Sequence, residues 1–185
     1  MRPRPPRRAL LGVFGALGSI ALGGCLAEGN RATPTPRPDA DGDGAPDHGD
    51  DYPTDDRRAV RTFRSTGSPT LQPGEFTAIA LTNAPTARGD VLHYEVTVAG
   101  STPVDCLVLE RDPYDAYVDG ARDVPIVDEY SRVGVREAEV TVELDRGEYL
   151  FVLDHTALKT DPGSDPVTVE HVVEMAEPAP TSTEE

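Results

Sequence analysis

The stretch Leu144-Asp145-Arg146-Gly147-Glu148-Tyr149-Leu150-Phe151-Val152-Leu153-Asp154 decides the fold class of this 185-residue chain. One strand ends near Leu144, Arg146-Gly147 supplies a turn, and Tyr149 to Leu153 form an uninterrupted apolar run. A Gly-containing turn between two such segments is typical of antiparallel strands. The stretch therefore predicts a β-hairpin whose second strand is central in its sheet.

Short apolar runs separated by turn signals continue on both sides of this stretch. Val91 to Val98 and Val140 to Leu144 alternate with period two, which places one face of each strand on a core and the other in solvent. The expected strands are Val60 to Arg64, Phe76 to Leu81, Val91 to Ala99, Val104 to Glu110, Ile126 to Tyr130, Ala138 to Leu144, Tyr149 to Asp154 and Val167 to Met175. With no persuasive helix, about seven or eight strands in residues 57–175 predict an all-β fold, a jelly-roll-like antiparallel β-sandwich.

The Leu144 to Asp154 stretch and the upstream Leu71-Gln72-Pro73-Gly74-Glu75 together carry a family resemblance. Over residues 70–156 the chain resembles the jelly-roll sandwiches of the bacterial pre-peptidase C-terminal type and the Golgi-dynamics-type domains. Such modules are typically accessory or adhesive, so the resemblance implies a binding role. It implies no particular activity, because a fold does not fix a function.

Residues 1–24 have the anatomy of an export signal, with a basic start that ends in Arg7-Arg8 and an apolar segment that follows it. The paired arginines resemble a twin-arginine signal, although Pro6 stands where Ser or Thr is common, and the general secretory route stays open. Leu22-Gly23-Gly24-Cys25 resembles a lipobox, which implies cleavage before Cys25 and a lipid on its sulfur. Two acyl chains give stable attachment, so we expect a lipoprotein on the outer face of the cytoplasmic membrane.

A Pro/Thr linker over residues 25–38 leads into an Asp-rich segment over residues 39–56. Counted from the first Asp, side-chain or carbonyl oxygens fall at positions 1, 3, 5, 7, 9 and 12, with Gly44 at position 6, which is the ligand spacing of a calcium loop. The expected ligands are Asp39, Asp41, Asp43, Ala45 through its carbonyl, Asp47 and Asp50. The alternative is an acidic linker that holds no ion.

The flanks of this segment exclude an EF-hand, because Pro38 and Pro53 leave no room for the two helices. The Asp spacing, Gly44 and Asp51-Tyr52-Pro53 instead resemble a thrombospondin type 3 calcium repeat. The chain departs from that repeat by having Tyr52 where many copies have Cys, and by having a single copy. The resemblance implies Ca²⁺ as the cofactor and a flexible stalk that the ion stiffens.

The charge balance limits the kinds of partner. Without the signal, 13 basic residues face 33 acidic ones, a net charge of −20, and 16 of the chain's 17 basic residues are Arg. Nucleic-acid binding is excluded because phosphate contacts need clustered basic residues. The bias resembles that of haloarchaeal secreted proteins, since at molar salt the Debye length is only about 3 Å and such a charge barely repels itself.

A second candidate site is the acidic loop between Glu110 and Gly120, which is expected to hold a cation or to stack tyrosine rings on a sugar or a partner. Its candidate residues are Asp112, Tyr114, Asp115, Tyr117 and Asp119. The alternative is a solvated loop. Cys106 is expected in the core, and the acidic residues 176–185 are expected to be a disordered tail.

No nucleophile elbow or paired zinc-ligand motif is present, so we expect no enzyme. The sequence predicts a membrane-anchored calcium-binding lipoprotein that presents a β-sandwich to an envelope protein or a glycan. The alternative is a carbohydrate- or solute-binding accessory lipoprotein, and a hydrolase with scattered carboxylates is the third hypothesis.

Overall fold

The structure is a computed structural model that describes residues 37–84, 89, 91–121 and 123–178. Residues 36–185 form one compact unit. The signal, Cys25, the linker up to residue 36 and the chain after residue 178 lie outside the described residues. Within the described part, no helix is long and apolar enough to cross a membrane.

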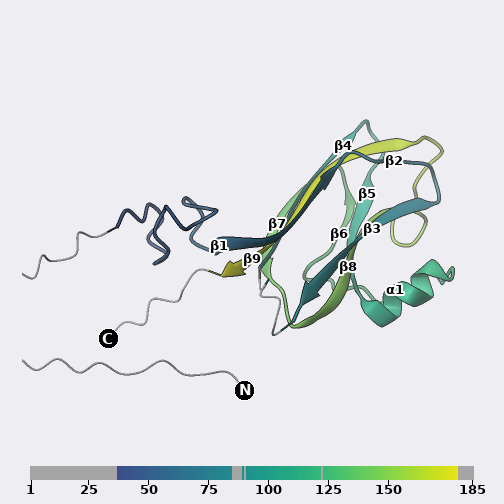
Figure 1. The fold of residues 1–185 in the computed structure, drawn as a ribbon. Helices are drawn as coiled ribbons and strands as arrows, with labels where there is room; N and C mark the ends of the chain where they lie inside the picture. Colours follow the sequence, from purple (N-terminus) through teal and green to yellow (C-terminus); the bar gives the residue numbers. More distant parts are fainter. Residues whose placement is uncertain (1–36, 85–88, 90, 122, 179–185) are drawn as a thin grey trace, which may run out of the picture. The chain divides into compact units, whose positions relative to one another are not determined.

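Two antiparallel sheets pack on each other (Figure 1). The strands are β1 (Arg58–Gly67), β2 (Thr70–Leu71), β3 (Glu75–Asn83), β4 (Val91–Ala99), β5 (Val104–Glu110), β6 (Arg132–Val135), β7 (Glu137–Glu143), β8 (Gly147–His155) and β9 (Val167–Pro178), with one helix, α1 (Arg111–Val118). Sheet A has the order β1-β9-β4-β7, with β2 also paired to β9. Sheet B has the order β3-β8-β5-β6.

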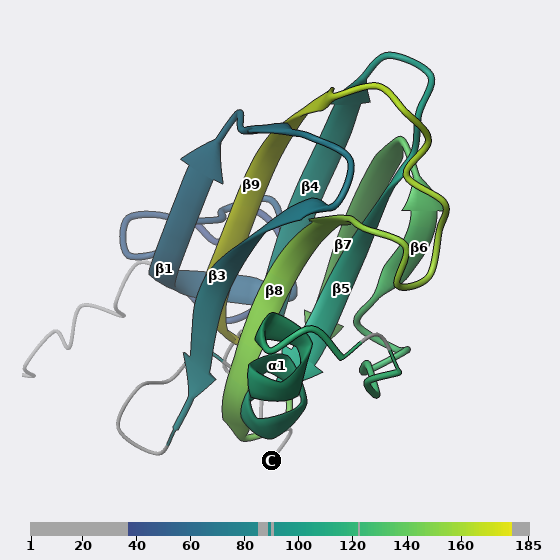
Figure 2. The ribbon, with the colours of Figure 1, turned by 90° about the vertical axis from the view of Figure 1, so that its right-hand side faces the viewer.

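The pairings wind the chain as a jelly roll. β1 pairs with β9, β3 with β8, β4 with β7 and β5 with β6, each pair antiparallel. The outermost strands β1 and β9 pair in sheet A, and each pair further inward in the sequence lies alternately in sheet B and sheet A. Figure 2 shows these strands in the two layers. The predicted all-β antiparallel sandwich of the jelly-roll type is confirmed.

The hairpin predicted over Leu144 to Asp154 is wrong. β7 lies at the edge of sheet A against β4, whereas β8 lies between β3 and β5 in sheet B. The turn after Leu144 therefore crosses from one sheet to the other, and the buried Asn83 side-chain amide donates a 2.6 Å hydrogen bond to the Leu144 carbonyl. A turn residue marks where the chain reverses, but it does not show which strand each arm joins.

Three further predictions need correction. Ile126 to Tyr130 form no strand; Ile126 packs beneath α1, the Val127 amide donates to the Val108 carbonyl, and the edge strand β6 begins only at Arg132. The presumed loop after Glu110 contains α1. β9 continues to Pro178, so residues 176–178, which were assigned to a disordered tail, belong to a strand.

The main core lies between the two sheets. It is built from the inward-facing side chains of both sheets, including Tyr94 and Phe151, whose ring centroids lie 4.7 Å apart. Strand β4 alternates buried and exposed residues along most of its length, as its sequence predicts. Its outward face is in solvent from Glu95 to Ala99, whereas the outward-facing Val91 and His93 are buried.

Sheet B is covered on its other face as well. Leu107 and Leu109 of β5 and Leu150 and Val152 of β8 pack with Tyr117 of α1 in a second apolar cluster. This cover explains why β5 and β8 are buried along almost their whole length. Strands buried on both faces are continuously apolar, which is the pattern from Tyr149 to Leu153.

The second cluster predicts that Leu150, on the face of β8 that α1 covers, is essential to stability. Leu150→Ala should lower the free energy of unfolding by about 2–5 kcal/mol, because the side chain is buried beneath α1. The matched control Val118→Ala removes an exposed side chain from the same region and should change stability by less than about 0.5 kcal/mol. Denaturant unfolding measures both, and a Leu150→Ala loss no larger than that of the control would show that this face of sheet B is uncovered.

Candidate functional site

The Asp-rich segment folds into a compact loop that brings its first three aspartates together. Carboxylate oxygens of Asp39, Asp41 and Asp43 all lie within 4.8 Å of one another. Gly42 and Gly44 have φ values of 78° and 93°, in the left-handed region that favours glycine. The two glycines allow the backbone to turn between the carboxylates, as the spacing predicts.

Both oxygens of Asp39 accept backbone amides, from Gly42 and Gly44, whereas Asp41, Asp43 and Asp50 each use only one oxygen in this way. The Oδ1 atoms of Asp41 and Asp43 accept backbone amides at 3.3 and 2.6 Å, and Asp50 Oδ1 accepts the Tyr52 amide at 2.7 Å. The Oδ2 atoms of the same three residues are buried and have no hydrogen-bond partner among the described residues. Local turns therefore fix the orientation of the carboxylates and leave three oxygens uncompensated.

Asp43 is the centre of the cluster and is only 7% exposed. Burial, together with the negative charges of Asp41, Asp50 and Asp39, raises the pKa of its carboxyl group. An isolated charge in such a position is costly unless it is paired or bound to a cation. The arrangement is suited to a hard cation with oxygen ligands.

The two remaining predicted ligands have other contacts. Asp47 Oδ1 accepts the Ala40 amide at 2.8 Å and closes the loop, while the Asp47 amide donates to the Pro38 carbonyl. Ala45 donates its amide to Asp43. Ligation by Asp47 and by the Ala45 carbonyl stays a prediction.

A group of contacts joins this loop to sheet A, and we call Tyr52, Arg58 and Glu174 the clamp. The Tyr52 hydroxyl donates to Glu174 Oε2 at 3.1 Å, and the Arg58 guanidinium lies 4.2 Å from the centre of the Tyr52 ring. Arg58 also donates to Glu174 Oε2 at 3.1 Å. Tyr52 is hence bonded at its amide to Asp50 and at its hydroxyl to β9.

Glu174 is buried on β9 and forms ion pairs with arginines of the neighbouring strand β1. Its Oε1 accepts from Arg64 at 2.7 Å and from Arg61 at 3.4 Å. The Asp51 amide donates to the Ala59 carbonyl, and Asp51 Oδ2 accepts the Arg61 amide at 2.9 Å. The buried carboxylate is thus surrounded by three guanidinium groups and a phenol.

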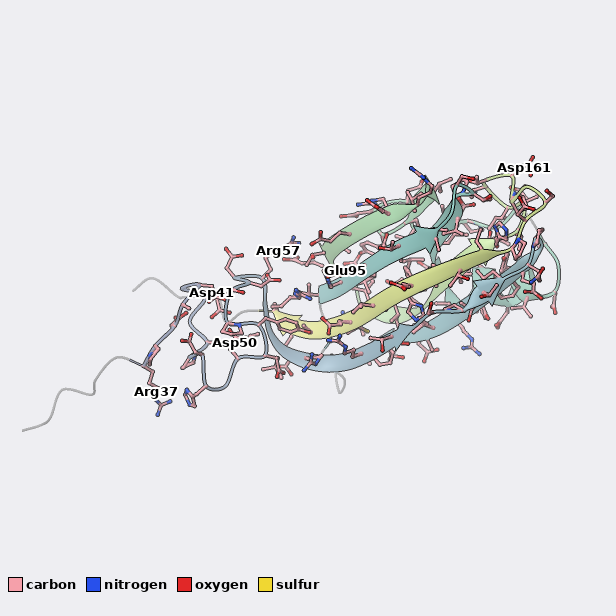
Figure 3. All side chains as sticks on the ribbon, turned by 90° about the horizontal axis from the view of Figure 1, so that it is seen from above. Arg37, Asp41, Asp50, Arg57, Glu95 and Asp161 are labelled. Carbon is pink, nitrogen blue, oxygen red and sulfur yellow. The ribbon has the colours of Figure 1, made fainter. Side chains whose placement is uncertain are left out.

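These contacts correct the expectation of a flexible stalk. The chain after Asp50 is bound to β1 and β9, and the exposed Arg57 reaches the Thr141 carbonyl of β7 at 2.6 Å. Figure 3 shows Asp41 and Asp50 in one loop, with Arg57 where the loop joins the sheet. The loop is part of the domain rather than a spacer below it.

The second candidate site changes character in the structure, because its residues lie in and after α1. Tyr117 is fully buried and donates from its hydroxyl to Asp154 at 2.7 Å, so its ring is not available to a sugar. Tyr114 is half-buried against Phe76, with ring centroids 6.5 Å apart. The remaining residues, Asp112, Asp115 and Asp119, are exposed.

The groups that a hydrolase would use have structural roles. Burial raises the pKa of Asp154, which accepts from Tyr117 and from the amide and hydroxyl of Thr156. Burial also raises the pKa of the Cys106 thiol to about 12, in agreement with its predicted place in the core. Ser131 joins the Val108 amide to a loop carbonyl.

Sequence analysis missed the clamp. Tyr52 and Glu174 lie 122 residues apart, and nothing local pairs them. One signal was present: four arginines fall between residues 57 and 64 of a chain that is otherwise acidic, and such a local positive cluster attracts a carboxylate.

No family model matches the chain, and no curated protein matches it. Among solved structures, a similarity is found to a periplasmic inhibitor of g-type lysozyme from Aeromonas hydrophila, with 11% identity, 63% of this chain and 87% of that chain covered, and a TM-score of 0.37. This similarity is too low to assign a fold family or a function, and neither is taken from it.

The clamp predicts an alkaline loss of stability that is specific to Tyr52. Burial and the nearby Glu174 charge raise the pKa of its phenol from 10.0 to about 12. Below pH 10 the phenol keeps its proton in both states; above it the unfolded chain releases the proton first, so this contribution is lost as the pH rises toward 12. Tyr52→Phe should cost about 1.5 kcal/mol near pH 8 and less near pH 11.5, measured by denaturant unfolding.

Other buried tyrosines are common to both proteins, so they cancel in the difference. A gap between wild type and Tyr52→Phe that keeps the same size from pH 8 to pH 11.5 would contradict a hydrogen bond between this phenol and Glu174.

Proposed function

We propose that the chain is an extracytoplasmic calcium-binding lipoprotein whose jelly-roll domain binds an envelope protein or a glycan. The observation that carries the calcium assignment is the set of three buried, unpartnered carboxylate oxygens on Asp41, Asp43 and Asp50. Native proteins seldom leave such oxygens uncompensated, because a buried carboxylate without a partner is strongly unfavourable.

The chemistry of the donors favours Ca²⁺. The proposed ligands offer oxygens only, from several carboxylates and one backbone carbonyl, at a spacing of two residues over the first five positions of the loop. Ca²⁺ takes six to eight such ligands in flexible geometry, whereas Mg²⁺ demands a near-octahedral shell and retains its waters. By analogy with extracellular modules, we expect a dissociation constant of about 10⁻⁴ to 10⁻³ M.

The clamp gives the ion a role in the domain. Asp50 accepts the Tyr52 amide, and Tyr52 bonds to Glu174 of β9, so a cation that fixes Asp50 also fixes Tyr52 against sheet A. The ion therefore stabilises the segment through which the chain enters the sandwich. We expect the bound state to hold residues 39–53 more firmly against sheet A.

The membrane and compartment assignments rest on the sequence. Leu22-Gly23-Gly24-Cys25 supplies the lipidation site, and the preceding segment supplies the export signal. The predominance of Arg over Lys and the net negative charge support a high-salt environment. A binding rather than a catalytic role fits the structural use of Asp154, Cys106 and Ser131.

Calorimetric titration of residues 26–185 with CaCl₂ at high KCl tests the calcium site. Wild type should release or absorb heat with a saturable curve, and thermal unfolding should shift upward at saturating calcium because the ion binds the folded state. Asp41→Ala/Asp43→Ala should abolish both effects, because it removes two of the converging ligands.

The matched control Asp112→Ala/Asp115→Ala removes the same charge from the exposed face of α1 and should retain the wild-type curve. Absence of any calcium effect in wild type would contradict the calcium site and leave residues 39–53 as an acidic segment that holds no ion. Loss of binding in the α1 variant instead would place the ion at the helix.

Cys25→Ser tests the lipid anchor. The variant should move from the membrane fraction to the soluble fraction after cell lysis and centrifugation, because attachment by two acyl chains is lost. Retention of the variant in membranes at the wild-type level would contradict the lipobox assignment.

A further inference from the structure

The two sheets have four edges, and three of them are protected against pairing with another strand. β7 carries three glutamates in seven residues, and β6 is only four residues long with a register shift against β5. β1 has two register shifts and carries Arg58, Arg61 and Arg64. Charges, short length and irregularity are the usual means by which proteins prevent edge-to-edge association.

β3, the remaining edge, has none of these features. It pairs with β8 over nine consecutive residues without a register shift, and it contains no charged residue and no proline from Phe76 to Asn83. Apart from the β8 ladder, no backbone hydrogen bond reaches residues 76–82 from elsewhere in the described chain. A long, regular, uncharged edge of this kind is a template for another strand.

The side chains along β3 are also incompletely covered. The four residues from Phe76 to Ile79 are half-buried, while Ala80 and Thr82 are exposed. Phe76 contacts the half-buried Tyr114 of α1 and packs at the margin of the second cluster. A strand added beside β3 would extend sheet B and cover these apolar groups.

We infer that β3 is a docking edge for a second copy of this chain, which pairs through its own β3. With 33 acidic residues against 17 basic ones, most contacts between two copies would bury acidic side chains against each other, and salt screens such buried pairs much less than exposed ones. The β3 edge avoids this cost, because it contributes no charge between Phe76 and Asn83. Two copies of one strand that pair antiparallel are related by a two-fold axis, and two-fold dimers are the commonest closed homo-oligomers.

The sequence of β3 is compatible with pairing to itself. With the two-fold axis at Ile79, Ala78 of one copy faces Ala80 of the other, and Thr77 faces Leu81. No like charges oppose each other, Ile79 faces the same residue of the other copy, and the small Ala78 and Ala80 lie on either side of it. The two copies would form one continuous eight-stranded sheet from their B sheets.

Sedimentation velocity of residues 36–185, the compact unit, tests the inference over a range of protein concentrations at high KCl. Wild type should show a concentration-dependent dimer, and amide exchange of residues 76–82 should slow as the dimer forms. Ala80→Lys/Thr82→Lys places charges on exposed positions of β3 and should raise the dissociation constant by at least about tenfold. The lysines at position 80 of the two copies then lie diagonally across the axis, and those at position 82 lie opposite the apolar Phe76.

Val60→Lys/Val133→Lys is the matched control. It adds the same two charges at exposed positions of the β1 and β6 edges and should leave the dissociation constant within about twofold of wild type. A protein that stays monomeric at every concentration overturns the inference. So does a dimer that both variants weaken equally, or one that the β3 variant leaves unchanged.

Discussion

A buried carboxylate on the last strand connects the beginning of the domain to its end. Glu174 accepts from Tyr52, Arg58, Arg61 and Arg64, and through them it holds the Asp-rich loop and β1 against β9. The contributions are unequal. Arg64 makes the shortest contact but is 48% exposed, where solvent screens the pair, whereas Arg58 is 12% exposed and also stacks on Tyr52. Arg58 is therefore the partner that chiefly compensates the buried charge.

The inner strands of the two sheets show how much a local pattern can predict. The bounds of β4 and β5 follow from the sequence, because alternation and continuous apolarity are local properties. The pairing of β8 does not follow, because β7 and β3 are equally acceptable neighbours by sequence and only the packing of the whole sheet selects β3. The continuous run from Tyr149 to Leu153 nevertheless carried information that the alternation rule ignores: both faces of the strand had to be covered.

Helix α1, which covers the outer face of sheet B, was harder to predict from the sequence. Residues 111–118 contain Pro113 and few apolar side chains, and they resemble a loop until the helix boundaries are considered. Proline is tolerated in the first helical turn, and Gly120, with φ of 102°, follows the helix end as a typical terminator. The aspartate loop was predictable for the opposite reason, because residues two apart in a tight turn converge without any help from the rest of the chain.

The position of β9 has a consequence for how the protein is made. This strand lies inside sheet A, between β1 and β4, and it is the last strand of the chain to be synthesised. β1 therefore cannot pair in sheet A until β9, more than a hundred residues later in the chain, has left the ribosome. Folds that depend on such distant contacts form slowly. Until β9 joins the sheet, β1 and β4 each expose the edge that β9 covers in the native fold, so an unfinished chain presents two unpaired strand edges.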